Sequence, residues 1–206
     1  MKLVLAAITA VTAAACQGKS TLMAEVDGVV LPEADQTIAA LDGPSVTIIP
    51  QGNEDLYKLP TGPVVRIAAD RGVSWRRVKQ VKDRLEKQGS TPVLLAGVGI
   101  TTEVRAFSPY QELRPGRHLV LDASRDGSFF AGEGDRDKGT RVQSFDHLHI
   151  SKSSIREVLG PLVQKSGLHD VEVRVDAHLN WADMVRAVDG SRTCCPGVDM
   201  RATLVE

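Results

Sequence analysis

Apolar residues recur with strand spacing in two stretches of the chain, and each stretch leads into a segment with helical spacing. Alternate side chains are apolar in 64–69 and in 170–175, which is the period of a strand with one buried face. Apolar residues then follow at helical spacing, at Trp75, Val78, Val81 and Leu85 and again at Trp181, Met184, Val185 and Val188. Ser74 and Asn180 precede these helices as expected N-caps. The pattern predicts a strand, a tight turn and a helix, twice.

The two stretches are copies of one another, 106 positions apart. Asp70, Trp75 and Asp83 in the first copy recur as Asp176, Trp181 and Asp189 in the second. An internal repeat bears on the whole architecture, so the two copies predict two similar units. Asp70 and Asp176 end their strands, where a short carboxylate accepts turn amide hydrogens, so a turn role is favoured over a catalytic one.

Other elements follow from shorter signals. Apolar runs predict strands at 29–31, 46–49, 93–96 and 198–205, a hairpin is predicted at 118–130 around Asp126-Gly127, and a helix at 154–162. Ser154 and Glu157 have the spacing of a capping box at the start of that helix, and Pro161 lies inside it. The fold class expected is α/β (α+β), built as two tandem small domains of sheet and helices, 16–99 and 117–206, joined by a linker at 100–116.

The first residues have the pattern of a secretory signal. Lys2 precedes the uncharged run 3–15, which is shorter than the about 20 apolar residues that span a bilayer. The residues before Cys16 resemble the lipobox of bacterial lipoproteins, which implies that 1–15 is a signal peptide, that Cys16 is lipidated, and that the protein is anchored in the cell envelope facing the periplasm. The same region also fits a relaxed P-loop over Ala13–Ser20, which would make the chain a nucleotide-binding enzyme.

The order of elements in the second half, together with a strand that ends in an aspartate and an aromatic-led helix, resembles the periplasmic domain of the ExbD/TolR family. The residues that carry this resemblance are Val173–Asp176, Trp181, Met184, Val185, Val188 and Gly197. The first half resembles a second, truncated copy. The chain has no charged residue in the apolar run 3–15, so the family's transmembrane aspartate, and with it the proton-motor role, does not carry over.

What the resemblance implies is a non-catalytic binding protein with an accessory role in biopolymer transport or envelope coupling. Its partners would be TonB-like or TolA-like segments, an ExbB-like motor, or peptidoglycan. Because these domains dimerise in the family, two in one chain predict an intramolecular pseudo-dimer. The short closing strands at 93–96 and 198–205 are expected to leave exposed sheet edges for an extended partner segment.

Composition and charge narrow the functions further. With 206 residues, 42% of them hydrophobic, the chain is long enough for one large core or two small ones. The net charge is −1, and the basic residues of the Trp75 helix are interrupted by Asp83 and Glu86, so we expect a solvated helix face and no nucleic-acid partner. No order of Ser, His, Cys and Asp stands out as a catalytic set, and no cofactor is expected.

Three further groups of residues have spacings that could carry chemistry. Asp122 to Glu133 fits the spacing of a calcium loop, although the neighbouring strand pattern favours a hairpin. His147 and His149 would share a side of an extended segment, without an indicated third metal ligand. Cys194 and Cys195 stand in what looks like a two-residue insertion relative to the first copy, and the sequence leaves open whether they bridge, pair with a partner or stay reduced.

Overall fold

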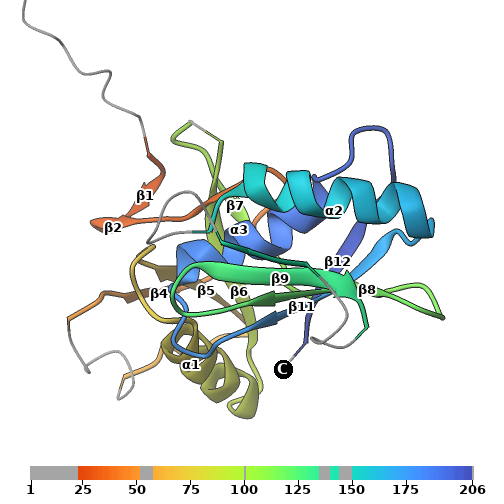
Figure 1. The fold of residues 1–206 in the computed structure, drawn as a ribbon. Helices are drawn as coiled ribbons and strands as arrows, with labels where there is room; N and C mark the ends of the chain where they lie inside the picture. Colours follow the sequence, from red (N-terminus) through yellow and green to blue (C-terminus); the bar gives the residue numbers. More distant parts are fainter. Residues whose placement is uncertain (1–22, 52–57, 100, 135–139, 144–149, 206) are drawn as a thin grey trace, which may run out of the picture.

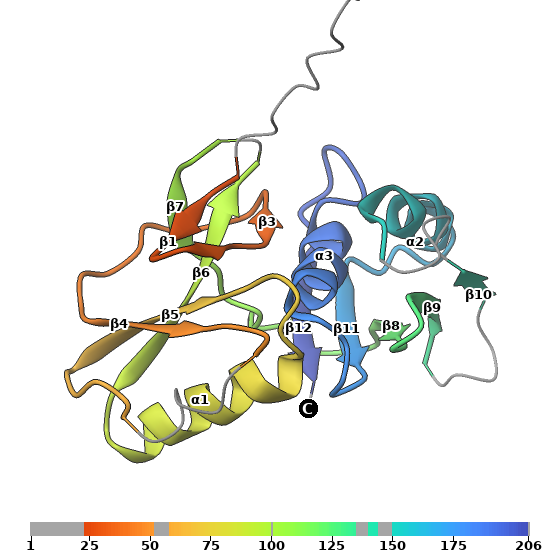
Figure 2. The ribbon, with the colours of Figure 1, turned by 90° about the vertical axis from the view of Figure 1, so that its left-hand side faces the viewer.

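Two mixed sheets lie side by side with helices packed against them (Figures 1 and 2). The structure is a computed structural model, and it describes residues 23–51, 58–99, 101–134, 140–143 and 150–205. Within these residues the chain forms three helices and sheets with both parallel and antiparallel strands, so the expected mixed α/β class is confirmed.

The first sheet has the strand order β3-β6-β5-β4, with β7 pairing antiparallel to β6. Its elements are β3 (Glu33–Ala34), β4 (Ser45–Ile48), β5 (Val64–Ala69), α1 (Trp75–Lys87), β6 (Thr91–Val98) and β7 (Val104–Ala106). The two faces of the sheet are covered differently. Helix α1 packs on one face, and the hairpin of β1 (Glu25–Val26) and β2 (Val29–Val30) covers the other, where Leu31 joins a small core with Ala68 and Leu95.

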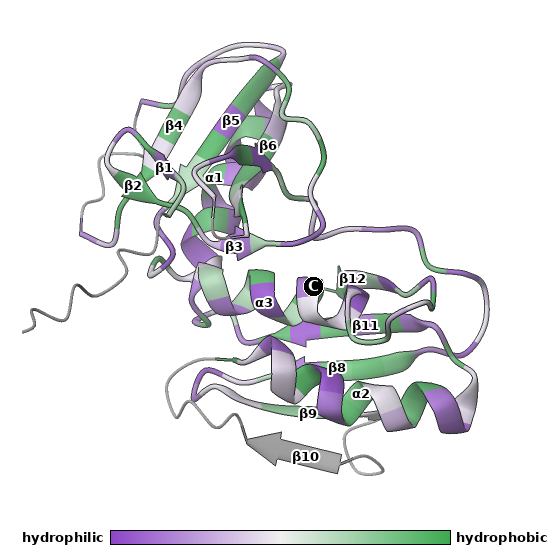
Figure 3. Cartoon of the chain, turned by 90° about the horizontal axis from the view of Figure 1, so that it is seen from above, coloured by the Kyte–Doolittle hydropathy of each residue, from purple (hydrophilic) through white to green (hydrophobic). Residues whose placement is uncertain are grey.

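The second sheet has the strand order β10-β9-β8-β11-β12. Its elements are β8 (Leu119–Ala123), β9 (Ser128–Glu133), β10 (Thr140–Gln143), α2 (Lys152–Ser166), β11 (Asp170–Val175), α3 (Trp181–Arg192) and β12 (Arg201–Val205). Strands β8 and β9 form the predicted hairpin, whose turn is closed by the Asp126 carboxylate accepting from the amide of Ser128 at 3.0 Å. Figure 3 shows α2 and α3 over this sheet.

Three adjacent parallel strands in each sheet correspond to one another. In the first sheet β4, β5 and β6 are adjacent and parallel, and in the second β8, β11 and β12 have the same relation. Strand β5 and helix α1 reappear as β11 and α3, each beginning 106 residues later. Val64 pairs with Thr91 whereas Asp170 pairs with Arg201, so the second copy has four extra residues between its strands, where the sequence indicated two.

One hydrophobic core contains residues of both copies. Buried side chains from α1, β5, α3, β8 and β11 belong to a single contact cluster, with Trp75 and Trp181 among them. The segment 100–116, expected as a linker, includes strand β7 and contributes Phe107 to the same cluster. The two units are therefore joined by packing as well as by the chain.

The start of α2 differs from the prediction. The helix begins at Lys152 with Ser151 as N-cap, so Ser154 lies inside the helix and forms no capping box. The Ser154 side chain is buried, and its hydroxyl has no hydrogen-bond partner among the described residues. The expected capping box was wrong because the helix begins two residues before Ser154, which places Ser154 on the buried face of the helix together with Ile155 and Leu159. Pro161 lies within the helix, which continues to Ser166.

Candidate functional site

The two copies meet at the turns that precede α1 and α3, through hydrogen bonds that come in equivalent pairs. The amide of Trp75 donates to the carbonyl of Leu179 at 2.7 Å, and the amide of Trp181 donates to the carbonyl of Val73 at 2.6 Å. A second pair runs from Arg76 N to Ala177 O and from Ala182 N to Arg71 O. The first amides of a helix have no partner within it, so here each helix start is satisfied by the turn of the other copy. The junction has approximate two-fold symmetry.

The two tryptophans pack on each other at this junction. Their rings are stacked with centroids 5.7 Å apart and an interplanar angle of 16°. Phe107 of the linker meets Trp181 edge-on at 6.0 Å. Trp181 is fully buried and Trp75 is 3% exposed, so the junction excludes both rings from solvent.

Asp70 and Asp176 lie in the turns before the two helices. The Asp70 carboxylate accepts from the amide of Gly72 at 2.9 Å, and that of Asp176 accepts from the amide of His178 at 2.7 Å. The two main-chain carbonyls also accept, from Val73 and Leu179 three residues on. These hydrogen bonds shape the turns that bring the copies together.

Asp83 and Asp189 occupy equivalent positions with different surroundings. Asp83 is a third exposed and pairs with Lys79 at 2.8 Å on the surface of α1. Asp189 is fully buried, accepts from the amides of Asp35 and Gln36 at 2.9 Å each, and pairs with Lys152 at 2.5 Å. The second aspartate thereby ties α3 to the segment after β3 and to the start of α2.

The linker covers the sheet edges that were expected to be exposed. Strand β6 is flanked by β5 on one side and by β3 and β7 on the other. At β12 the amide of Leu204 donates to the carbonyl of Pro109 at 2.9 Å, and the amide of Ala202 donates to the Gln111 side chain at 3.3 Å. The prediction of exposed edges at both closing strands was wrong, because residues after Val104 run from one strand to the other and pair with both.

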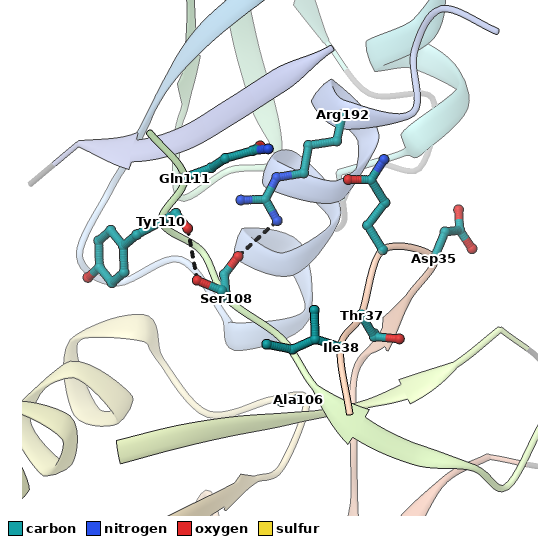
Figure 4. A pocket seen from close by; sticks show the side chains of 9 residues that line it. Asp35, Thr37, Ile38, Ala106, Ser108, Tyr110, Gln111 and Arg192 are labelled. Carbon is teal, nitrogen blue, oxygen red and sulfur yellow. Dashed lines mark hydrogen bonds between the residues drawn. The ribbon is translucent and has the colours of Figure 1, made fainter. Parts of the chain in front are cut away.

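A groove follows this linker, with a hollow where α3 ends. We call this hollow at the end of α3 the junction hollow. The junction hollow has a volume of about 520 Å³ and is lined by residues that include Asp35, Gln36, Ile38, Ser108, Gln111 and Arg192 (Figure 4). Arg192 comes from the last turn of α3, and the other residues come from the linker and from the segment after β3. The junction hollow is therefore built by both copies.

Arg192 is a buried cation in the wall of this hollow. Its side chain is only 7% exposed, and it donates to the carbonyl of Ala202 from Nε at 3.1 Å and from Nη2 at 2.8 Å, and to the carbonyl of Ser108 from Nη1 at 2.8 Å. Burial lowers the pKa of Arg192 from its usual value, and the charge of Asp189 opposes that shift. Within the described residues Arg192 has no carboxylate in salt-bridge contact.

Cys194 and Cys195 lie in the turn after α3, with their sulfur atoms 2.6 Å apart. Cys194 is buried and Cys195 is partly exposed. Burial raises the pKa of the Cys194 thiol, and its neighbour Cys195 adds to the shift. A raised pKa keeps this thiol protonated at neutral pH, which disfavours a role as a nucleophile.

Several predicted sites fall outside the described residues, namely Cys16, the P-loop alternative at Ala13–Ser20, and His147 with His149. The calcium alternative lies within the hairpin of β8 and β9. Glu133 pairs with Leu119 at the open end of that hairpin, whereas Asp126 lies in its turn, so these carboxylates do not surround one point. Across the ranges that the structure covers, no three His, Cys, Asp or Glu side chains are grouped as a metal site.

Sequence reasoning missed the residues that form the junction hollow. Arg192 reads as an ordinary basic residue at a helix C-terminus, and Gln111 and Ile38 lie in segments without periodic structure. The one available signal is that Arg192 closes a helix in which most positions are apolar or small, with Asp183, Arg186 and Asp189 as the other charged residues.

Comparison with known proteins finds no matching family model, no matching curated protein and no matching solved structure. In the part of the chain that is described, none of the helices has both the length and the hydropathy needed to cross a bilayer.

Proposed function

We propose that this chain is a non-catalytic binding protein of the cell envelope, in which two ExbD/TolR-like units act as one intramolecular pseudo-dimer. The observation that carries the proposal is the reciprocal pairing of the two helix starts, with Trp75 stacked on Trp181 between them. Interfaces with two-fold symmetry are the usual way in which identical subunits pair, and here the repeat provides both partners within one chain.

The order of elements in the second unit supports the proposed kinship. A hairpin of β8 and β9 is followed by α2, by β11 ending before Asp176, by α3 led by Trp181, and by the closing strand β12. This is the order on which the resemblance to ExbD/TolR periplasmic domains was based. The first unit has the corresponding β5, α1 and β6 and lacks a counterpart of α2 among its described residues.

The proposed role is to hold an extended protein segment, such as a TonB-like or TolA-like periplasmic segment, beside the membrane. The groove supports this role because residues of both units line it, with polar residues such as Arg192 at one end and apolar residues such as Ile38 and Leu94 beyond them. A test would mix the purified chain lacking 1–15 with such segments and with soluble peptidoglycan fragments, and follow binding by calorimetry. Binding of a protein segment is expected. If only peptidoglycan binds, the ligand class is wrong, and if nothing binds, the binding role is refuted.

The proposed membrane anchor is the acyl group on Cys16, after removal of 1–15. Replacing Cys16→Ser should move the protein from the membrane fraction to the soluble fraction or block its processing. Cys195→Ser is a matched control, because it removes a different thiol and should leave the fractionation unchanged. A Cys16→Ser protein that remains in the membrane fraction with unchanged processing would refute the anchor.

A further inference from the structure

The groove continues beyond the junction hollow into a second, more apolar hollow. This apolar hollow has a volume of about 230 Å³ and is lined by residues that include Pro92, Leu94, Phe107, Pro109, Lys82 and Glu86. Both hollows share Ile38, Ala106, Ser108 and Tyr110. They are therefore neighbouring parts of one groove, which runs along the linker from the end of α3 toward β6.

The centre of the groove presents apolar side chains to solvent. Ile38 is 64% exposed and Tyr110 is 36% exposed, although both lie beside buried residues of the core. In Figure 4 the Ile38 side chain extends from the segment after β3 toward the linker, and the Tyr110 ring points away from it on the other side of the linker. Apolar side chains left exposed within a groove are typical of binding surfaces.

At the other end, Arg192 offers hydrogen-bond donors to the junction hollow. A guanidinium has five N–H donors, and the hydrogen bonds to Ala202 and Ser108 account for three of them. The remaining two, one on each terminal nitrogen, have no partner within the described residues. A buried guanidinium with spare donors is suited to a carboxylate, which accepts a pair of hydrogen bonds from such a fork.

The other charges around the junction hollow leave this position available. The Asp35 carboxylate is 42% exposed at the wall and pairs with Lys152 at 3.2 Å, and the buried Asp189 pairs with the same lysine at 2.5 Å. Both acids thus contact the same lysine and neither is in salt-bridge contact with Arg192 within the described residues, although the charge of Asp189 still acts on Arg192 at longer range. Arg192, which has no such ion pair within the described residues, is the cation that an incoming carboxylate would meet.

We propose that the groove binds an extended peptide segment through the side-chain carboxylate of a glutamate, held by Arg192, and through an apolar side chain placed against Ile38. Arg192 is 93% buried, so a ligand carboxylate has to reach it from within the junction hollow. In an extended segment residues two apart share one side, which lets a glutamate and an apolar residue enter the same groove. The inference rests on the proposed binding function and specifies its ligand.

The test uses paired peptides, because replacing Arg192 would also remove its bonds to β12 and the linker and could unfold the protein. The probes are the acetylated and amidated peptide GSLTETLSG and its counterpart with glutamine in place of glutamate. Affinities are measured by NMR titration of the ¹⁵N-labelled chain lacking 1–15, with the Nε–H signal of Arg192 as a local reporter. The glutamate peptide is expected to bind at least about tenfold more tightly and to shift that signal, since charge-assisted hydrogen bonds are about twice as strong as neutral ones. Equal affinities within twofold would overturn the proposal.

A pair of surface variants locates the apolar contact. Ile38→Ser should weaken binding of the glutamate peptide about fivefold or more, whereas Leu41→Ser should not change it, because Leu41 is similarly exposed (56%) and does not line either hollow. Equal effects of the two substitutions would refute the location.

The outcomes separate this inference from the proposed function. If TonB-like or TolA-like segments bind, but neither compete with the glutamate peptide nor respond to Ile38→Ser, the binding function stands and this groove is not its site. If sedimentation shows a dimer that Ile38→Ser dissociates, the occupant is a second copy of the chain and the proposal is wrong. If neither the segments nor the peptide bind, both proposals fall.

Discussion

Replacing the two stacked tryptophans, singly and together, measures whether the two units share one core. Truncating a large buried aromatic to alanine costs about 3–5 kcal/mol, which is a large part of the about 5–15 kcal/mol that stabilises a typical domain. Leucine fills part of the space, so we expect Trp75→Leu and Trp181→Leu each to lower the free energy of unfolding by about 2–3 kcal/mol. The indole nitrogen of Trp181 is buried with no hydrogen-bond partner among the described residues, so replacing this ring does not sacrifice a hydrogen bond.

The decisive quantity is the coupling between the two substitutions. Stacked aromatic pairs contribute about 0.5–1.5 kcal/mol beyond the area that they bury, and the two rings are 5.7 Å apart with nearly parallel planes. The double variant should therefore be less destabilised than the sum of the single variants by about 1 kcal/mol. Denaturant titrations give this value, followed by circular dichroism for all four proteins because the double variant has no tryptophan left.

A second cycle provides the control. Phe129 lies on β9 and, within the described residues, makes no ring contact with Trp75, so Trp75→Leu and Phe129→Leu should be additive within about 0.3–0.5 kcal/mol. Coupling below about 0.3 kcal/mol between Trp75 and Trp181 would mean that each ring stabilises its own unit, and the pseudo-dimer would lose its main support.

Three further comparisons use equivalent or neighbouring positions. Asp189→Asn should lower the free energy of unfolding by about 3–5 kcal/mol because it breaks a buried ion pair. Asp83→Asn, at the equivalent position on the surface, should change the free energy of unfolding by less than about 0.5 kcal/mol. Equal losses in denaturant titrations would contradict the different environments of the two aspartates. Asn180→Ala should lower the free energy of unfolding by about 1 kcal/mol because the Asn180 side chain accepts a hydrogen bond from the amide of Asp183. Ser74→Ala should lower it little because the Ser74 side chain makes no capping hydrogen bond. Thermal melting checks the difference. The raised pKa of Cys194 means that the folded state favours the protonated thiol, so the contribution of this thiol to stability is full below the unfolded-state pKa of about 8.5 and declines as the pH rises above it. Melting curves from pH 7 to 10 should show a decline in melting temperature that Cys194→Ala reduces. An identical decline in both proteins would refute this assignment.

The local elements were predictable because each depends on a short pattern. The alternation at 64–69 and 170–175 gives β5 and β11, and Asp126-Gly127 gives the turn of the hairpin between β8 and β9. The helical faces led by Trp75 and Trp181 are the buried faces of α1 and α3. These patterns succeed because a buried face fixes the period of the residues that form it.

The junction and the groove were not predictable from the same patterns. The sequence shows that Trp75 and Trp181 are equivalent, but stacking them on one another requires a two-fold arrangement that no local period specifies. The course of residues 104–111 likewise depends on which strand edges are left over once both sheets have formed. Arg192 becomes part of a site only because that linker and the segment after β3 reach it.

The linker breaks the symmetry of the two units, and equivalent positions have diverged where it passes. Arg192 corresponds to Glu86 in the first copy, 106 residues earlier, so opposite charges occupy the same place on the two helices. Arg192 lines the junction hollow and is buried, whereas Glu86 lines the apolar hollow and pairs with Lys82 on the surface. A symmetric dimer would offer two identical sites, each able to bind its own partner segment. Here a single linker follows one path across the junction, so the groove has a cationic end and an apolar end, and an extended segment that satisfies both can bind once and in one direction.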